Sequence, residues 1–302
     1  MQSRTPVLAW LLLILLSLIW GSSFILIKRG LIGLNPTELG ALRIFLAGVV
    51  MLPLAVRRFG QVPKHRIKFL IVIALVGSFV PSFLFAIAQT RLASSITGVL
   101  NAVTPIFTIL IGVLVYGQKK DPRVYIGVLI GFVGTATLIT NGSLGSIQHI
   151  NAYALLIVIA SMLYGVNGNV IKFHLSDLPA LTITSVSLSF GGIVSGLYLI
   201  FFTDYFHRVS HLEEVLHASY YIVFLGVLGT ALALVIFNRL VQLTDPVFTS
   251  SVTYIIPIVA VLWGLWDGES LYPAHYVGIL LILLGVYITN KLSVRKQKKL
   301  NP

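Results

Sequence analysis

Two hydroxyl side chains, Ser22 and Ser23, stand inside an apolar run that begins at Val7 and ends at Lys28. A polar group in lipid must hydrogen-bond to another helix or line a wet cavity. Arg43 lies about one and a half turns into the next apolar run, where a charge costs roughly 2.5–3.5 kcal/mol on insertion scales. This guanidinium either binds a carboxylate or phosphate ligand, or caps helix carbonyls and pairs across helices. The sequence leaves both alternatives open.

Further polar and aromatic side chains fall within apolar runs, and together they could line a cavity that binds a metabolite. The predicted substrate-binding residues are Trp20, Ser22, Ser23, Arg43, Phe85, Gln89, Asn101, Tyr164, Asn167, Asn169, Asn238, Tyr254 and Trp263. For each one alone, helix packing or an interfacial position is the alternative. Pro105 and Pro257 lie mid-run, where proline frees a carbonyl and bends a helix. We predict that these prolines serve as gates, with static shaping of the helices as the alternative.

Catalysis and metal binding have little support in the sequence. An enzyme acting within the membrane would need a nucleophile–base pair, an acid cluster or metal ligands at one depth, and none is visible. The chain has no cysteine, which excludes disulfides and thiolate-bound metal. His207 and His211 stand four residues apart, a spacing that could bind zinc, but an amphipathic surface helix over 204–217 is the favoured interpretation. We predict no catalytic residue and no metal site.

The composition is that of an integral membrane protein. Of 302 residues, 57% are hydrophobic and only 10% are charged, whereas a soluble domain carries about 25% charged residues. The net charge of +12 could suggest a nucleic-acid partner. However, Lys and Arg gather in short segments between apolar runs, as topology determinants do. The sequence therefore predicts the lipid bilayer as a partner and no nucleic acid.

Ten apolar runs are long enough to cross the membrane, since about 30 Å of hydrocarbon takes roughly 20 helical residues. The predicted spans are 7–27, 37–56, 67–88, 95–116, 123–140, 152–171, 180–203, 218–241, 246–266 and 273–290. Of the 21 Lys and Arg residues, 16 fall on the side of the N-terminus and 4 on the other, with Arg43 inside a span. This bias predicts that both termini are cytoplasmic, as an even number of spans allows.

The orientation can be tested by labelling, because the chain has no native cysteine. A cysteine introduced at Asn141 should react in intact cells with a membrane-impermeant thiol reagent, and one at Lys120 should not. Reaction at Lys120 without reaction at Asn141 would reverse the predicted topology.

The sequence repeats itself in two halves. WGSSFILIK (20–28) matches YGVNGNVIK (164–172), and SSITGVLNAVTPIFTILIGVL (94–114) matches PVFTSSVTYIIPIVAVLWGLW (246–266). The offsets run from 144 to 152, and we predict two repeats, 1–144 and 145–302. Five spans in each half is an odd number, so the second repeat must be inverted in the membrane. Inverted repeats around a midplane site are typical of secondary transporters.

The motifs also resemble a known family. WGSSFILIK, LRIFLAG (42–48) and the proline-bearing spans closed by GQ (117–118) and GE (268–269) resemble the EamA-type members of the drug/metabolite transporter superfamily. The resemblance implies an all-α fold of ten transmembrane helices in two inverted five-helix repeats. It also implies a central cavity, a polar or amphipathic metabolite as substrate, and no cofactor. Gln118 departs from the family, whose first half often carries Glu there.

Together, these features predict a secondary transporter of the bacterial cytoplasmic membrane. We expect export of amino acids or similar small metabolites by alternating access, with a homodimer left open. No carboxylate lies near the middle of a span, which favours export down a gradient over proton coupling. The alternatives are an intramembrane enzyme or flippase acting on a lipid or isoprenoid, and a channel-like protein, for which no filter element is visible.

Overall fold

The computed structural model describes residues 7–139, 151–243 and 252–300, and these ranges are helical without a strand. The elements are α1 (Val7–Gly30), α2 (Pro36–Phe59), α3 (Lys64–Ala74), η1 (Leu75–Phe79), α4 (Val80–Ala88), α5 (Ser94–Asn101), α6 (Thr104–Leu114), α7 (Val124–Ile139), α8 (Ala152–His174), α9 (Ala180–Phe202), α10 (Tyr205–His211), α11 (Glu213–Gly226), η3 (Val227–Leu232), α12 (Ala233–Leu243), α14 (Val252–Trp266) and α15 (Pro273–Leu300). Helices suit lipid because they satisfy every backbone polar group within one segment.

The helix lengths bear on the predicted spans. Three shorter apolar helices lie at Val124–Ile139, Ile255–Trp266 and Pro273–Thr289. The segments that are long and apolar enough to cross a membrane are Val7–Gly30, Pro36–Phe59, Lys64–Ala88, Ser94–Leu114, Ala152–His174, Ala180–Phe202 and Glu213–Phe237. The predicted all-α membrane architecture is thus confirmed in the described residues. The count of ten crossings stays a prediction.

Two of the long helices contain a π-helical turn at equivalent places in the two halves. The turn η1 joins α3 to α4, and the turn η3 joins α11 to α12. Residues 77–78 in η1 are Gly-Ser and residues 229–230 in η3 are Gly-Thr, at the same repeat offset as the two prolines. A π turn interrupts the regular hydrogen-bond ladder and is common at functional sites. Neither π turn is expected from the hydrophobic pattern of the sequence.

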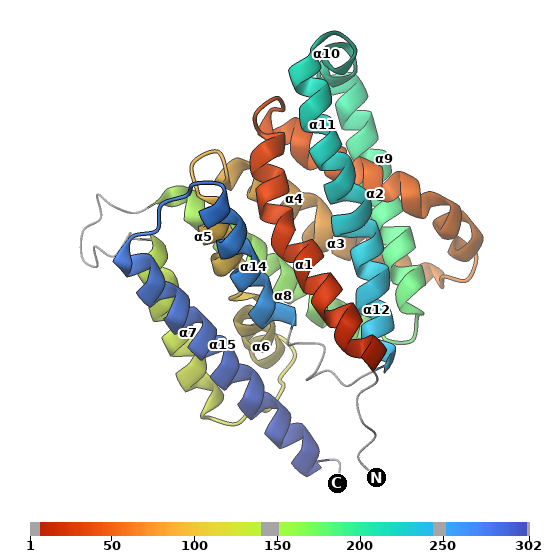
Figure 1. Cartoon of the computed structure of the whole chain (residues 1–302). Helices are drawn as coiled ribbons and strands as arrows, with labels where there is room; N and C mark the ends of the chain where they lie inside the picture. Colours follow the sequence, from red (N-terminus) through yellow and green to blue (C-terminus); the bar gives the residue numbers. More distant parts are fainter. Residues whose placement is uncertain (1–6, 140–150, 244–251, 301–302) are drawn as a thin grey trace.

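Helices of one half pack against helices of the other half (Figure 1). The helix α1 packs on α14 and α12, while α8, its repeat equivalent, packs on α6 and α4. The helix α2 packs on its own equivalent α9, and α7 packs on its equivalent α15, side by side in Figure 1. Reciprocal contacts of this kind are typical of halves related by a two-fold axis. The predicted boundary at residue 144 lies outside the described residues.

Glycines lie where the equivalent helices α7 and α15 touch. A Cβ added at Gly127 would lie 2.7 Å from the carbonyl oxygen of Gly285, and one added at Gly134 would lie 2.8 Å from that of Gly278. In the repeat, Gly127 corresponds to Gly278 and Gly134 to Gly285. Gly127 therefore faces Gly285, the equivalent of Gly134, and Gly134 faces Gly278, the equivalent of Gly127. The missing side chains let the two helices approach closely.

The predicted surface helix over 204–217 is divided: the short helix α10 ends at His211, and α11 begins at Glu213. Arg208 of α10 donates to both carboxylate oxygens of Glu38, at 3.0 and 2.8 Å, and this pair fastens α10 to the start of α2. The rings of His207 and His211 stack with centroids 4.4 Å apart. No cluster of three metal-ligand side chains occurs among the described residues.

Candidate functional site

A cavity of about 350 Å³ lies between the helices and is lined by residues of both halves. Its volume falls at the lower end of the range for small-molecule pockets, roughly 300–1,000 Å³. Its walls combine aromatic rings with neutral polar groups, which suits an amphipathic ligand. The predicted site residues that line it are Trp20, Ser23, Arg43, Phe85, Asn101, Tyr164 and Asn167.

The lining is made largely of repeat-equivalent pairs. Trp20 with Tyr164 and Ser23 with Asn167 are pairs that the sequence repeat already brings together. The repeat also pairs other lining residues, several of which the sequence analysis misses: Gly77 with Gly229, Ser78 with Thr230, Phe85 with Phe237, and Asn101 with Thr253. Each of these pairs has the same offset as Pro105 and Pro257, so the repeat register alone could have identified them.

The π turn η3 presents polar atoms to the cavity wall. The indole Nε1 of Trp20 donates to the carbonyl oxygen of Gly229 at 3.1 Å. The hydroxyl of Thr230 donates to the carbonyl oxygen of Leu225 at 3.1 Å and accepts a hydrogen bond from Nε of Arg43 at 3.1 Å. The turn therefore orients both the indole ring of Trp20 and the guanidinium of Arg43.

The two π-turn glycines make room for the paired polar side chains of α1 and α8. A Cβ added at Gly77 would lie 2.5 Å from Oδ1 of Asn167, and one at Gly229 would lie 3.1 Å from Oγ of Ser23. Any larger residue at Gly77 would displace Asn167. The same contact thus occurs twice, each time between the π turn of one half and a helix of the other half.

The fourth span is interrupted beside the cavity, between α5 and α6. Pro105 lies in the first turn of α6. Because proline has no backbone N–H, it cannot donate a hydrogen bond to the carbonyl oxygen of Asn101. The hydroxyl of Thr104 donates to that oxygen instead, at 2.8 Å. Pro257 lies inside α14. A bend at Pro105 is expected from the sequence, and the structure has a break between α5 and α6 there.

Several other predicted site residues do not line this cavity. The hydroxyl of Ser22 accepts a hydrogen bond from Nε1 of Trp263 at 2.7 Å, which joins α1 to α14. Asn169 donates to the carbonyl oxygens of Thr108 and Gly165, both at 2.9 Å. Gln89 is buried beyond the end of α4. The side chains of Asn238 and Tyr254 lie outside those that the structure describes.

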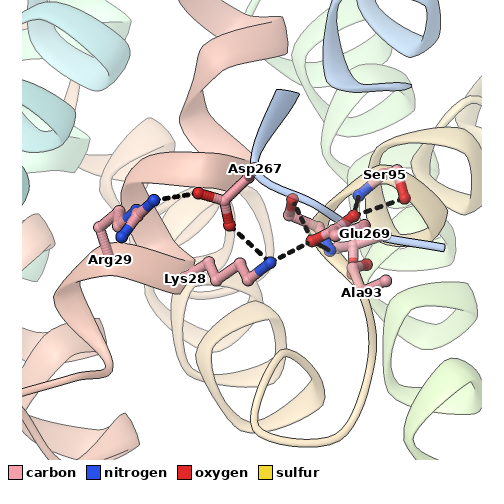
Figure 2. A network of polar contacts seen from close by, with 8 residues as sticks. Lys28, Arg29, Ala93, Ser95, Asp267 and Glu269 are labelled. Atoms are coloured by element: carbon pink, nitrogen blue, oxygen red, sulfur yellow. Dashed lines mark hydrogen bonds and ion pairs between the residues drawn. The ribbon is translucent and has the colours of Figure 1, made fainter. Parts of the chain in front are cut away.

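A network of charges and hydroxyls joins the two halves at one face of the bundle (Figure 2). Nζ of Lys28 lies 2.7 Å from Oδ2 of Asp267 and 2.8 Å from Oε1 of Glu269. Arg29 also pairs with Asp267. The four residues, at the end of α1 and in the turn between α14 and α15, form the ionic network.

Glu269 also caps the start of α5. Its Oε1 accepts from the backbone N–H and hydroxyl of Ser94, at 2.9 and 2.8 Å. Its Oε2 accepts from the same groups of Ser95, at 3.0 and 2.6 Å. Burial alone would raise the pKa of the Glu269 carboxyl, but the hydrogen bonds from Lys28, Ser95 and Ser94 outweigh it and lower this pKa to about 2.

Lys28 has a charged repeat equivalent, Lys172, but Arg29 and Asp267 do not. Arg29 corresponds to Phe173 and Asp267 to Tyr116. The rings of Tyr116 and Phe173 stack with centroids 4.2 Å apart and planes 8° apart. An ion pair between the halves is thus replaced by an aromatic stack at the equivalent position.

Comparisons with known proteins agree with this arrangement. The sequence pattern of the EamA-like transporter family matches residues 7–140 and 151–291. The uncharacterized inner membrane transporter YedA of Escherichia coli K12 is 23% identical over 90% of this chain and 87% of its own. A protein of the same organism named "Probable amino-acid metabolite efflux pump" is 23% identical over 99% of this chain and 98% of its own.

The chain is also similar to an archaeal protein in sequence and to a solved structure in fold. An uncharacterized transporter of Archaeoglobus fulgidus is 25% identical over 92% of this chain and 97% of its own. One crystal structure superposes with a TM-score of 0.63 at 16% identity, over 96% of this chain and 98% of that chain. That structural likeness establishes a common fold.

Proposed function

Because this chain belongs to the EamA-like transporter family, we propose that it is a secondary transporter that exports amino acids or similar small metabolites. The observation that carries the proposal is the cavity, built from equivalent residues of both halves. A site shared between two repeats can open to either side when one repeat rocks against the other. One relative is named a probable amino-acid metabolite efflux pump, which supports the outward direction.

The proposed architecture has ten membrane crossings in two inverted five-helix repeats, with both termini in the cytoplasm of a bacterial cell. In this arrangement the ionic network closes the external face, and the stack of Tyr116 on Phe173 closes the cytoplasmic face. Pro105 and Pro257, beside the cavity in equivalent helices, serve as the bending points. Alternating access then means that one closure opens while the other stays shut.

The described cavity lining also supports transport without catalysis. It contains no carboxylate and no histidine, so it offers no general base for a serine or threonine hydroxyl. The same lining supports transport that is not coupled to protons, because a proton relay needs a titratable group near midplane.

Counterflow in proteoliposomes tests the proposal. Vesicles containing the purified protein are loaded with unlabelled amino acids and given each labelled amino acid in turn, with and without a pH gradient. Accumulation that needs the internal pool but no pH gradient is the expected result. Uptake that continues without an internal pool and never saturates would identify a channel instead.

Ser23→Leu and Asn167→Leu should each abolish counterflow. The introduced leucine would fill part of the cavity and remove one of two equivalent polar groups from its lining. Met162→Leu, on an exposed position of α8, is the control and should leave counterflow unchanged. Thermal unfolding of the purified variants checks that they are folded. Normal counterflow by both cavity variants would refute the site.

A further inference from the structure

The two repeats contribute different charges to the lining of the cavity. Among the described lining residues, the sole charged side chain is Arg43. The other half has Ser187 at the equivalent position, and its hydroxyl donates back to the carbonyl of Ile183 at 2.8 Å on its own helix. The cavity therefore carries one positive charge, contributed by one repeat only.

Within the part of the chain that the structure describes, the guanidinium of Arg43 is hydrogen-bonded through Nε and through neither of its terminal nitrogens. Nε donates to the hydroxyl of Thr230, whose own proton goes to the carbonyl of Leu225, so this threonine acts as a fixed acceptor. No carboxylate of the described residues forms an ion pair with Arg43. Its two terminal amino groups thus leave a planar fork of donors at the cavity wall, the geometry that binds carboxylate and phosphate groups bidentately.

A charge in such a site needs a counter-charge, because the surrounding helices and lipid solvate it poorly. Since the described lining offers none, we propose that the ligand supplies it: the substrate is a small organic anion whose carboxylate or phosphate binds Arg43. This inference rests on the proposed transport function and narrows its substrate class. Amino acids bind through their carboxylate, and cations without an acidic group are excluded.

The rest of the ligand should be apolar and compact. The rings of Phe85 and Tyr164 are 6.1 Å apart with planes 25° apart, and those of Trp20 and Phe237 are 5.6 Å apart. These pairs form two aromatic surfaces on the lining of the cavity that contains Arg43. They suit an aryl or branched alkyl group on the acid.

Calorimetric titration of the purified wild-type protein tests this directly, with probes that share one ring and differ in charge. The probes are phenylacetate, phenyl phosphate, phenylalanine and phenethylamine. Phenylacetate or phenyl phosphate should bind at least 10-fold more tightly than phenethylamine, and phenylalanine should bind in between. If no acidic probe binds more tightly than phenethylamine, the inference is overturned, and this result depends on no variant.

Variants then assign the effect to the guanidinium. Arg43→Gln should weaken binding of the acidic probe about 10- to 100-fold, the usual effect of losing hydrogen bonds to a charged group. Arg43→Lys should restore part of it, and the matched control Ser187→Ala should bind as the wild type does. Unchanged binding by Arg43→Gln would overturn the assignment.

Failure of this inference can be distinguished from failure of the proposed function. If acidic probes bind through Arg43 but no counterflow occurs, the transport proposal fails and the anion site stands. If counterflow occurs with a cationic substrate, or is unchanged in Arg43→Gln, the transporter stands and the anion site fails.

Discussion

Replacing Glu269 by glutamine should lower the free energy of unfolding by about 2–3 kcal/mol, because several charge-assisted hydrogen bonds are lost at once. The carboxylate accepts from both Ser94 and Ser95 and pairs with Lys28, and its side chain is only 6% exposed. An amide keeps one acceptor oxygen and turns its NH₂ group toward donors. Unfolding with SDS in mixed micelles measures the loss.

The contribution of Glu269 should also depend on pH. Its pKa is about 2 in the folded protein, below the ordinary value of 4.5, so the stabilisation is present above pH 4.5 and is lost as the pH falls toward 2. Glu269→Gln should therefore unfold with a weaker acid dependence than the wild type. Glu213→Gln is the control, since that side chain is 86% exposed and should change the free energy of unfolding little. Equal stabilities of wild type and Glu269→Gln would contradict the assigned role.

Gly48→Leu should destabilise the protein by about 3 kcal/mol or more, through overpacking where α2 crosses α9. A Cβ at this position would lie 2.6 Å from the Cα of Gly192 and 2.8 Å from the carbonyl oxygen of Leu188. Both are backbone atoms, so the helices themselves would have to separate. The same unfolding titration, and the yield of monodisperse protein, measure the effect.

Gly60 provides the matched control for this substitution. It ends α2 with a φ of −63°, and nothing lies within 4 Å of an added Cβ. Gly60→Leu should therefore leave stability nearly unchanged. A similar loss in both variants would mean that the added side chain destabilises the protein for a reason other than overpacking at the crossing, and would contradict this prediction.

The helices could be predicted from the sequence because lipid imposes both length and apolar composition on every span. Their interruptions could be predicted only in part. The proline at 105 indicates a bend, but the structure has a break there, where the hydroxyl of Thr104 donates to the carbonyl oxygen of Asn101. The π turns lie within apolar runs that differ little from regular helix. Only the repeated Gly-Ser and Gly-Thr pairs signal them.

The cavity residues could be predicted in part because equivalent positions of the repeats meet there. The burial of Asn169 and the bond from Trp263 to Ser22 could not, since a polar residue in an apolar run satisfies itself equally well on a neighbouring helix. The ionic network could not be predicted either. Lys28 and Glu269 are 241 residues apart, and charges at the ends of spans are ordinary in any membrane protein.

In the proposed mechanism the ionic network closes one face and the stack of Tyr116 on Phe173 closes the other, so salt in the medium should act on the two closures differently. The side chains of Lys28 and Arg29 are 36% and 46% exposed, so dissolved salt screens their attraction to Asp267. Stacked rings are held by dispersion and exclusion of water, which salt at such concentrations hardly weakens. Raising the ionic strength on the side of the ionic network should thus favour opening on that side alone. The composition of the medium would then set the resting balance between the two orientations of the site.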